Sequence, residues 1–174
     1  RQLLTYELDL YLSGRTSQTG DEPALAHADN QSYLYYRKGA IVMNALRDLL
    51  GEKAVNTALR NLLREQGGPG HNPTTADFLR HVYAVAKPEQ HALIDEWMND
   101  VVLYDFKLLS AESRRMADGR YAVKMRISAA KQRADDQALP MRELIDIGIF
   151  SAEDKTLHLA KHALREGTQE ITVI

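Results

Sequence analysis

The sequence contains no cysteine among its 174 residues. This absence excludes disulfide bonds, metal sites built from thiolates and a cysteine nucleophile. It leaves the cellular compartment open, because an exported protein that is stable without disulfides needs no cysteine either.

The chain also lacks an excess of one charge and a long apolar run. Its 22 basic and 24 acidic residues nearly cancel, for a net charge of −2. No basic stripe indicates nucleic acid as a partner, and no acidic tail indicates a disordered segment. No apolar run reaches the roughly 18 residues of a membrane span, and no signal peptide opens the chain. Because Arg1 stands in a mid-helix pattern and Ile174 in a mid-strand pattern, we expect a soluble fragment of a longer protein, of unknown localisation.

No complete set of metal ligands occurs in the sequence. A zinc peptidase site of the His-Glu-x-x-His type needs two histidines one helical turn apart, with a glutamate directly after the first. His158 and His162 have the spacing, but no carboxylate follows His158. Their segment alternates like a strand, so we expect two solvated positions. We expect no metal and no cofactor to be bound by this fragment.

The sequence is rich in apolar residues, at 44%, which is ample for a core. Its clearest helix covers residues 33–50 and ends at Gly51, where a left-handed cap would stand. Apolar positions recur there at helical spacing and share one face: Tyr35, Gly39, Val42, Leu46 and Leu49. A glycine inside a helix costs about 1 kcal/mol relative to alanine, so we expect another group to pass close to the backbone at Gly39.

Further helices are indicated on both sides of this segment. A second helix is expected from about Glu52 to Glu65, stopped by a glycine-rich stretch. Thr74 and Asp77 have the spacing of a capping box, and Pro88 suits the first turn of another helix. Short helices with tight connections predict an all-helical bundle or solenoid.

Near Tyr104 the period of the apolar residues changes from helical to alternating. Residues 121–127 read as a half-buried strand, and Asp118-Gly119 before them is a hairpin signal. Similar patterns farther on bring the expected strands to five. We predict an α+β fold in two parts, with helices over 1–105 and an antiparallel, Ig-like β-sandwich, incomplete at its last strand, over 106–174.

One segment resembles a known family. Tyr36-Arg37-Lys38-Gly39, followed by an apolar helix ending in Leu49-Leu50-Gly51, is similar to the Tyr-x-Lys-Gly segment of the aminopeptidase N-like zinc metallopeptidases, the gluzincin aminopeptidases. The longer stretch from Leu34 to Met43 most resembles bacterial members fused to an ABC-transporter-permease-like membrane region. The family also has a tryptophan-bearing helix, matched by Trp97, at the end of its catalytic domain, and a small β-sandwich after it.

The resemblance implies a function for one residue. In the family, the tyrosine that matches Tyr36 points its phenol at the scissile carbonyl and stabilises the transition state. The zinc ligands precede this segment, so zinc would belong to the parent protein, with ligands upstream of Arg1. The resemblance thus implies a C-terminal portion of a zinc aminopeptidase that is inactive alone. Its partners would be a peptide substrate, in the parent, and the upstream zinc-binding part, without nucleic acid and without a membrane segment of its own.

Other interpretations stay open from the sequence. Aromatic residues at a helix start usually pack against the core, and we expect Tyr35 to do so. The family has an acidic or small residue where Arg37 stands, so the roles of Arg37 and Lys38 are undetermined. The alternative function is a non-catalytic scaffold of helices and sandwich that binds a protein partner.

Overall fold

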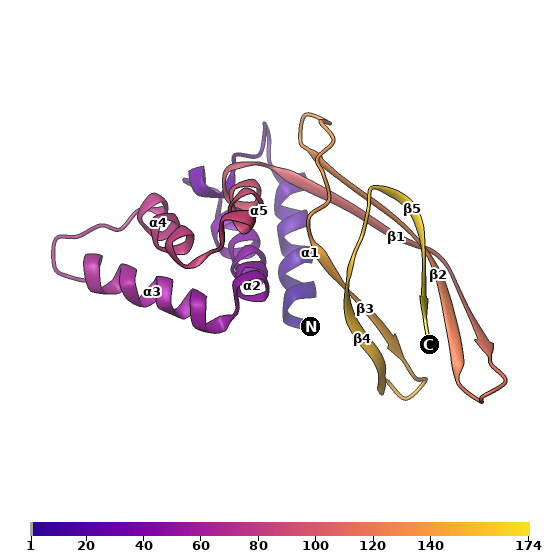
Figure 1. Ribbon diagram of the computed structural model, residues 1–174. Helices are drawn as coiled ribbons and strands as arrows, with labels where there is room; N and C mark the ends of the chain where they lie inside the picture. Colours follow the sequence, from indigo (N-terminus) through magenta and orange to yellow (C-terminus); the bar gives the residue numbers. More distant parts are fainter. Residues whose placement is uncertain (1) are drawn as a thin grey trace. The chain divides into compact units, whose positions relative to one another are not determined.

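A computed structural model describes residues 2–174, and the chain divides into two compact units, Arg1–Val101 and Val102–Ile174 (Figure 1). The first unit is helical and the second consists of antiparallel strands. The fold is therefore α+β in two parts, as predicted. The division falls slightly earlier than the expected boundary between residues 105 and 106, because the first strand begins at Val102.

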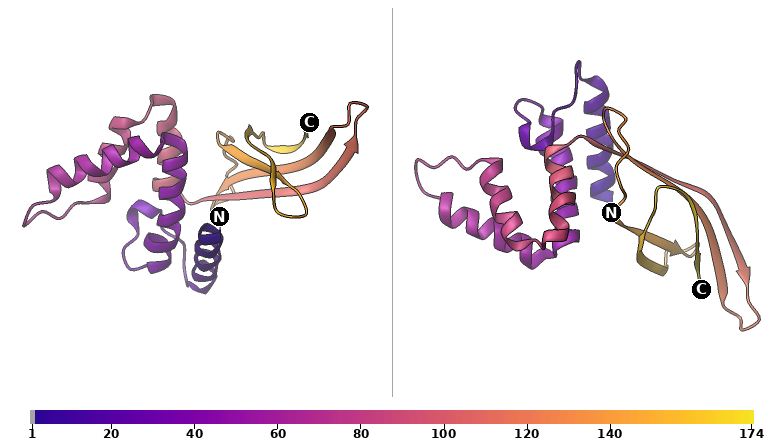
Figure 2. Two further views of the ribbon diagram at one scale, coloured as in Figure 1. Left: turned by 90° about the horizontal axis from the view of Figure 1, so that it is seen from below. Right: turned by 45° about the horizontal axis from the view of Figure 1, so that its top comes forward.

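The helical unit is built from short helices joined by tight turns, seen from two further sides in Figure 2. Its elements are α1 (Gln2–Ser17), the 3-10 turn η1 (Leu25–His27), the π-helix η2 (Tyr33–Lys38), α2 (Gly39–Leu50), α3 (Glu52–Gln66), α4 (Thr75–Val85) and α5 (Pro88–Asn99). Residues of α2 to α5 share one core: Val42, Leu46, Val55, Ala58, Leu79, Val82, Ile94 and Met98.

The ends of these helices follow the signals in the sequence. Thr74 and Asp77 form the expected capping box at the start of α4, with each side chain bonded to the other's backbone N–H. Pro88 opens α5 in the first turn. Gly51 ends α2 with a positive φ of 86°, although its ψ of 149° departs from the left-handed helical conformation.

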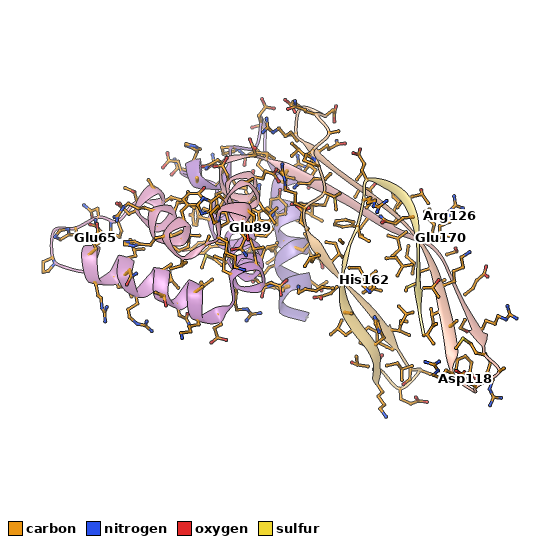
Figure 3. All side chains as sticks on the ribbon, in the orientation of Figure 1. Glu65, Glu89, Asp118, Arg126, His162 and Glu170 are labelled. Atoms are coloured by element: carbon orange, nitrogen blue, oxygen red, sulfur yellow. The ribbon has the colours of Figure 1, made fainter. Side chains whose placement is uncertain are left out.

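The β unit consists of two antiparallel sheets around a second core. One sheet has the order β1-β2-β5, and the other pairs β3 with β4. The strands are β1 (Val102–Arg115), β2 (Tyr121–Arg133), β3 (Leu144–Phe150), β4 (Thr156–Ala163) and β5 (Gly167–Val173). Side chains from β2 and β3 meet in the core, as in a sandwich: Met125, Ile127, Ala129 and Ile147, together with Leu164. Asp118, labelled in Figure 3, lies in the predicted hairpin turn between β1 and β2.

The two histidines of β4 are half-buried and face inward, which corrects the expectation of two solvated positions. In the register of β3 and β4, His162 pairs with Ile145 and His158 with Ile149. Cross-strand partners share a face, so both imidazoles lie on the face that packs against the core. Each Nε2 atom is buried, and the two ring centroids are 6.0 Å apart. Leu157 and Leu159, which alternate with the histidines, are exposed, so the apolar residues of this strand face outward.

Residues 2–174 include no helix with the length and hydrophobicity that crossing a bilayer requires.

Candidate functional site

Tyr36 lies in η2, the six-residue π-helix that precedes α2. Its side chain is 65% exposed, and the ring packs edge-on against Tyr35 with the centroids 4.7 Å apart. Among residues 4–174, whose side chains the structure describes, no hydrogen bond to its hydroxyl group is found. The phenol is thus presented outward from a helical segment and is free to donate a hydrogen bond.

The π-helix changes which residues face the core. Its hydrogen bonds span five residues, as in the bond from the N–H of Gly39 to the carbonyl of Leu34. Within this segment Leu34 is fully buried, while Tyr35 is 45% exposed. Lys38, four residues before the buried Val42, is also buried. The expectation that Tyr35 is a core residue is therefore wrong. The sequence pattern predicts an α-helical period over residues 33–50, whereas the first six of these residues form a π-helix.

Gly39 does not have the close neighbour that the sequence suggested. A Cβ added there would meet only the carbonyl oxygen of Leu34, at an ordinary 3.6 Å. The close approach in this region is instead at Gly14 of α1, where an added Cβ would lie 2.7 Å from Cγ of Tyr33. Gly14 allows α1 and η2 to pack closely, so the glycine that shapes the site is on the neighbouring helix.

A buried carboxylate connects α1 with the end of η2. The side chain of Glu22 is only 4% exposed and accepts from Lys38 Nζ at 2.6 Å and from Arg15 Nε at 2.7 Å. The hydroxyl of Tyr11 donates to both carboxylate oxygens, at 3.0 and 2.9 Å. Lys38 Nζ also lies 5.7 Å from the centroid of the Tyr11 ring. Glu22 therefore joins two residues of α1 to Lys38, the lysine of the family-like segment.

Arg37 makes a second ion pair between η2 and α1. Its Nη1 atom lies 3.1 Å from Oε2 of Glu7, and Arg37 is more exposed than Lys38, at 38% against 11% of the side chain. The sequence left the roles of both residues open. In the structure each binds a glutamate, and neither cation points freely toward solvent as an unpaired charge.

The tyrosines behind the site stay protonated at physiological pH. Tyr11 and Tyr33 stack with centroids 6.1 Å apart. Burial, followed by the negative charge of Glu22, raises the pKa of Tyr11 far above its ordinary value of 10. The pKa of Tyr33 is raised for the same two reasons. Both phenols are therefore neutral structural groups.

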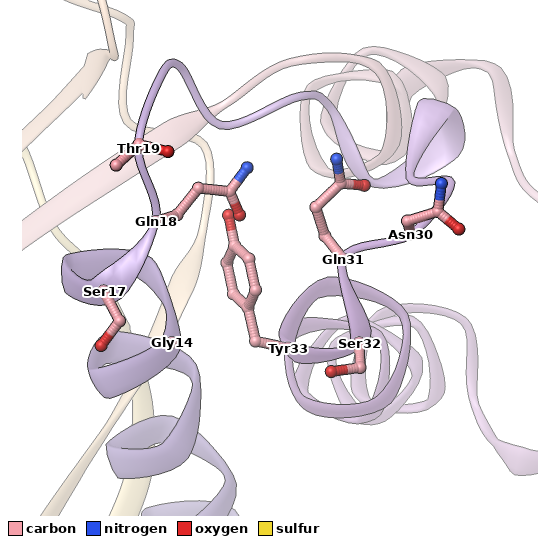
Figure 4. A pocket seen from close by; sticks show the side chains of 8 residues that line it. All are labelled: Gly14, Ser17, Gln18, Thr19, Asn30, Gln31, Ser32 and Tyr33. Atoms are coloured by element: carbon pink, nitrogen blue, oxygen red, sulfur yellow. The ribbon is translucent and has the colours of Figure 1, made fainter.

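A polar hollow of about 450 Å³ lies between the end of α1 and the start of η2 (Figure 4). Its lining carries amides and hydroxyls but no charged side chain: Gly14, Ser17, Gln18, Thr19, Asn30, Gln31, Ser32 and Tyr33. The Tyr33 hydroxyl is buried there without a hydrogen-bond partner in the described part of the chain, and Figure 4 shows it directed toward Gln18. The hollow is wide open to solvent and adds no chemical group to Tyr36.

Sequence reasoning missed Glu22 and Tyr11, which lie against Lys38. Residues 14–31 read as a polar connection, and one glutamate in such a stretch carries no signal of its own. An indirect signal existed in Lys38, because a cation at a helix position that the structure turns inward needs an acidic partner. Lys38 stands four residues before Val42 and so shares its face of the helix, which means that helical spacing alone indicated a buried cation.

The described residues do not fit a zinc site. No three or more histidine, aspartate or glutamate side chains within residues 2–174 are grouped so that they could hold a metal ion. Comparison with protein-family models, curated proteins and solved structures gives no match for this chain.

Proposed function

We propose that this chain is the C-terminal portion of an aminopeptidase N-like zinc metallopeptidase, in which Tyr36 supports peptide-bond hydrolysis. The observation that carries the proposal is the state of Tyr36: exposed, without a hydrogen-bond partner in the described chain, and held on a π-helix. Short π-helical segments are rare and are frequent at functional sites. The family-like residues around Tyr36 supply the reaction class.

The chemistry assigned to Tyr36 is hydrogen-bond donation to a developing oxyanion. As a peptide carbonyl becomes tetrahedral, negative charge gathers on its oxygen, and a fixed phenol stabilises that oxygen more than the ground-state carbonyl. A donor of this kind is worth about 10²–10³ in rate. Because the described residues hold no metal site, zinc and the groups that activate water would come from the parent protein outside this chain.

The proposal has a direct genetic test. The coding sequence upstream of Arg1 should contain His-Glu-x-x-His and a downstream glutamate, the ligand set and base of this family. An open reading frame that extends well upstream without them would contradict the enzymatic proposal. The peptide substrate and a membrane-attached bacterial parent belong to the same proposal and depend on the same result.

A second candidate function is a non-catalytic scaffold that binds a protein partner. It is favoured by apolar side chains on the outer face of the β3-β4 sheet, where Leu144, Phe150, Leu157 and Leu159 are between 41% and 62% exposed. Exposed apolar patches commonly mark protein interaction sites. If the upstream sequence lacks zinc ligands, this function is the one to test, by replacing Leu157 and Leu159 with serine in a binding assay with candidate partners.

A further inference from the structure

We infer that β1 is a self-complementary interface, through which two copies of this chain pair antiparallel about Ser110 and form a dimer with one continuous sheet. The inference goes beyond the proposed function and uses no property of Tyr36. It rests on the unpaired edge of β1, on the order of charges along its outer face and on its β-bulge.

The strand β1 is long and has one unpaired edge. In the part of the chain that the structure describes, it pairs with β2 alone (Figure 1). Every residue from Tyr104 to Arg115 is exposed. The backbone N–H and C=O groups along such an edge can bind another strand, and proteins usually shorten or cover it. The edge of β1 therefore offers a second strand of equal length a full row of backbone partners.

The register with β2 shows which side chains of β1 share a face. Odd-numbered residues of β2, such as Met125 and Ile127, point into the core, so the even-numbered ones point outward. Between Leu108 and Ser110, β1 carries one extra residue, Leu109, which has no partner in β2. The outward positions of β1 are consequently odd before this bulge and even after it. In chain order they are Asp105, Lys107, Ser110, Glu112 and Arg114.

This outer row complements itself when it is read in the opposite direction. Antiparallel pairing about Ser110 brings Asp105 opposite Arg114 of the second copy, and Lys107 opposite Glu112 of the second copy. The two-fold symmetry forms each of these pairs twice. Opposite charges directly across antiparallel strands stabilise the pairing, and like charges destabilise it. Without Leu109, Asp105 and Arg114 would point to opposite faces of the sheet, so the bulge is part of the match.

The inner face of β1 favours the same partner. Phe106 and Leu108 are 39% and 62% exposed, because the core described for the β unit takes its side chains from other strands. In the register about Ser110, Leu108 lies opposite Ala111 of the second copy and Phe106 opposite Ser113. Each copy would thus remove apolar surface of the other from water. A peptide of different sequence could bind the edge, but β1 itself supplies the charge order that the outer row requires.

The first experiment exchanges one charge at a time in the full chain and measures the dimer dissociation constant by analytical ultracentrifugation at low salt. Lys107→Glu sets two carboxylates opposite each other, and Glu112→Lys sets two ammonium groups opposite each other. Each variant should weaken the dimer by about tenfold or more. An equimolar mixture of the two variants should form heterodimers as tightly as the unsubstituted chain does, because each mismatch is corrected across the interface. Lys155→Glu, at an exposed residue outside β1, is the control and should leave the dissociation constant unchanged.

The second experiment tests the register. Residues directly opposite in antiparallel strands have Cα atoms about 4.5–5.5 Å apart, which a disulfide can bridge. Ser110→Cys should therefore give a covalent dimer on mild oxidation, and the sequence has no other cysteine to interfere. Ser113→Cys, on the same strand but away from the symmetry axis, should stay largely uncrosslinked.

Three results would overturn the inference. The first is an unsubstituted chain that remains monomeric at about 1 mM, where even a weak interface would be populated. The second is a dimer that neither charge variant weakens, or whose affinity the mixture of variants does not restore. The third is equal crosslinking of Ser110→Cys and Ser113→Cys. Circular dichroism of each variant confirms that it is folded, as expected for substitutions at exposed positions.

Discussion

Gly14 and Gly39, two glycines near Tyr36, have different surroundings. Adding a methyl group at each should therefore change the free energy of unfolding in opposite directions. Gly14→Ala places a Cβ against the ring of Tyr33 and should destabilise the chain by about 1–3 kcal/mol through overpacking. Gly39→Ala meets no close neighbour and should stabilise it by about 0.5–1 kcal/mol through helix propensity. Urea denaturation of the two variants tests this. Equal effects of the same sign would contradict the packing of α1 on η2.

A buried ion pair in the β unit should be costly to break on one side. The fully buried Lys131 lies 2.7 Å from Glu143, which also accepts from the hydroxyl of Tyr104 at 2.6 Å. Lys131→Met leaves a buried carboxylate without its cation and should lower the free energy of unfolding by about 3–5 kcal/mol. Lys124→Met, at an exposed pair with Glu170, is the control and should change stability little. If both variants lost the same free energy of unfolding, the burial of the Lys131 ion pair would not contribute to stability.

The same pair predicts a dependence of stability on pH. Burial alone raises the pKa of Glu143, but hydrogen bonds from Lys131 and Tyr104 outweigh it and hold the pKa below its ordinary value of 4.5. Because the pKa is lower in the folded state, this stabilisation is present above about pH 4.5 and is lost as the pH falls through the folded pKa. Unfolding measured from pH 7 downward should show a smaller acid loss in Lys131→Met. An identical pH profile in both proteins would rule Glu143 out as the cause.

Residue types predicted burial well only where the local period was regular. Met125 and Ile127 are buried as their alternation predicts, in a strand whose register has neighbours on both sides. Tyr35 and His158 were placed on the wrong side, for different reasons. The first lies in a π-helix, and the second lies in a strand where apolar residues face outward and histidines inward.

At the scale of elements, the start of α4 offers a clean test of a cap. The hydroxyl of Thr74 accepts from the N–H of Asp77, and the carboxylate of Asp77 accepts from the N–H of Thr74. Thr74→Ala should lower the free energy of unfolding by about 1 kcal/mol. Thr75→Ala, one residue inside the helix, should be neutral or slightly stabilising. Thermal unfolding of both variants distinguishes a cap from a general preference for threonine.

Helix ends were more predictable than helix interiors. A helix begins or ends at each of three residues through local backbone chemistry, so the residue types alone predict these helix ends: Thr74, Pro88 and Gly51. The π-helix of η2 has no such signal, and Lys38 at its end binds a glutamate sixteen positions earlier in the chain. The sequence around Tyr36 was thus enough to locate the candidate site. It did not predict that Glu22 binds Lys38, Arg15 and Tyr11.

At the scale of the whole molecule, each unit has a core of its own. A piece ending at Val101 should therefore fold and give a helical far-UV circular dichroism spectrum with a cooperative thermal transition. Loss of helicity or of cooperativity in this piece, compared with the intact chain, would show that the helical unit depends on the strands. The change of period near Tyr104 predicted this layout because helical and alternating patterns cannot serve the same element.

The proposed function is tested most directly by replacing Tyr36 with phenylalanine in a longer protein that carries this chain and, as proposed, the zinc ligands. Tyr36→Phe removes one hydroxyl from an exposed ring and should lower kcat by about 10²–10³, with zinc content and melting temperature nearly unchanged. Tyr35→Phe, in the adjacent ring, should retain most activity. A value of kcat near that of the unsubstituted enzyme for Tyr36→Phe, in an active and zinc-loaded protein, would remove Tyr36 from the mechanism.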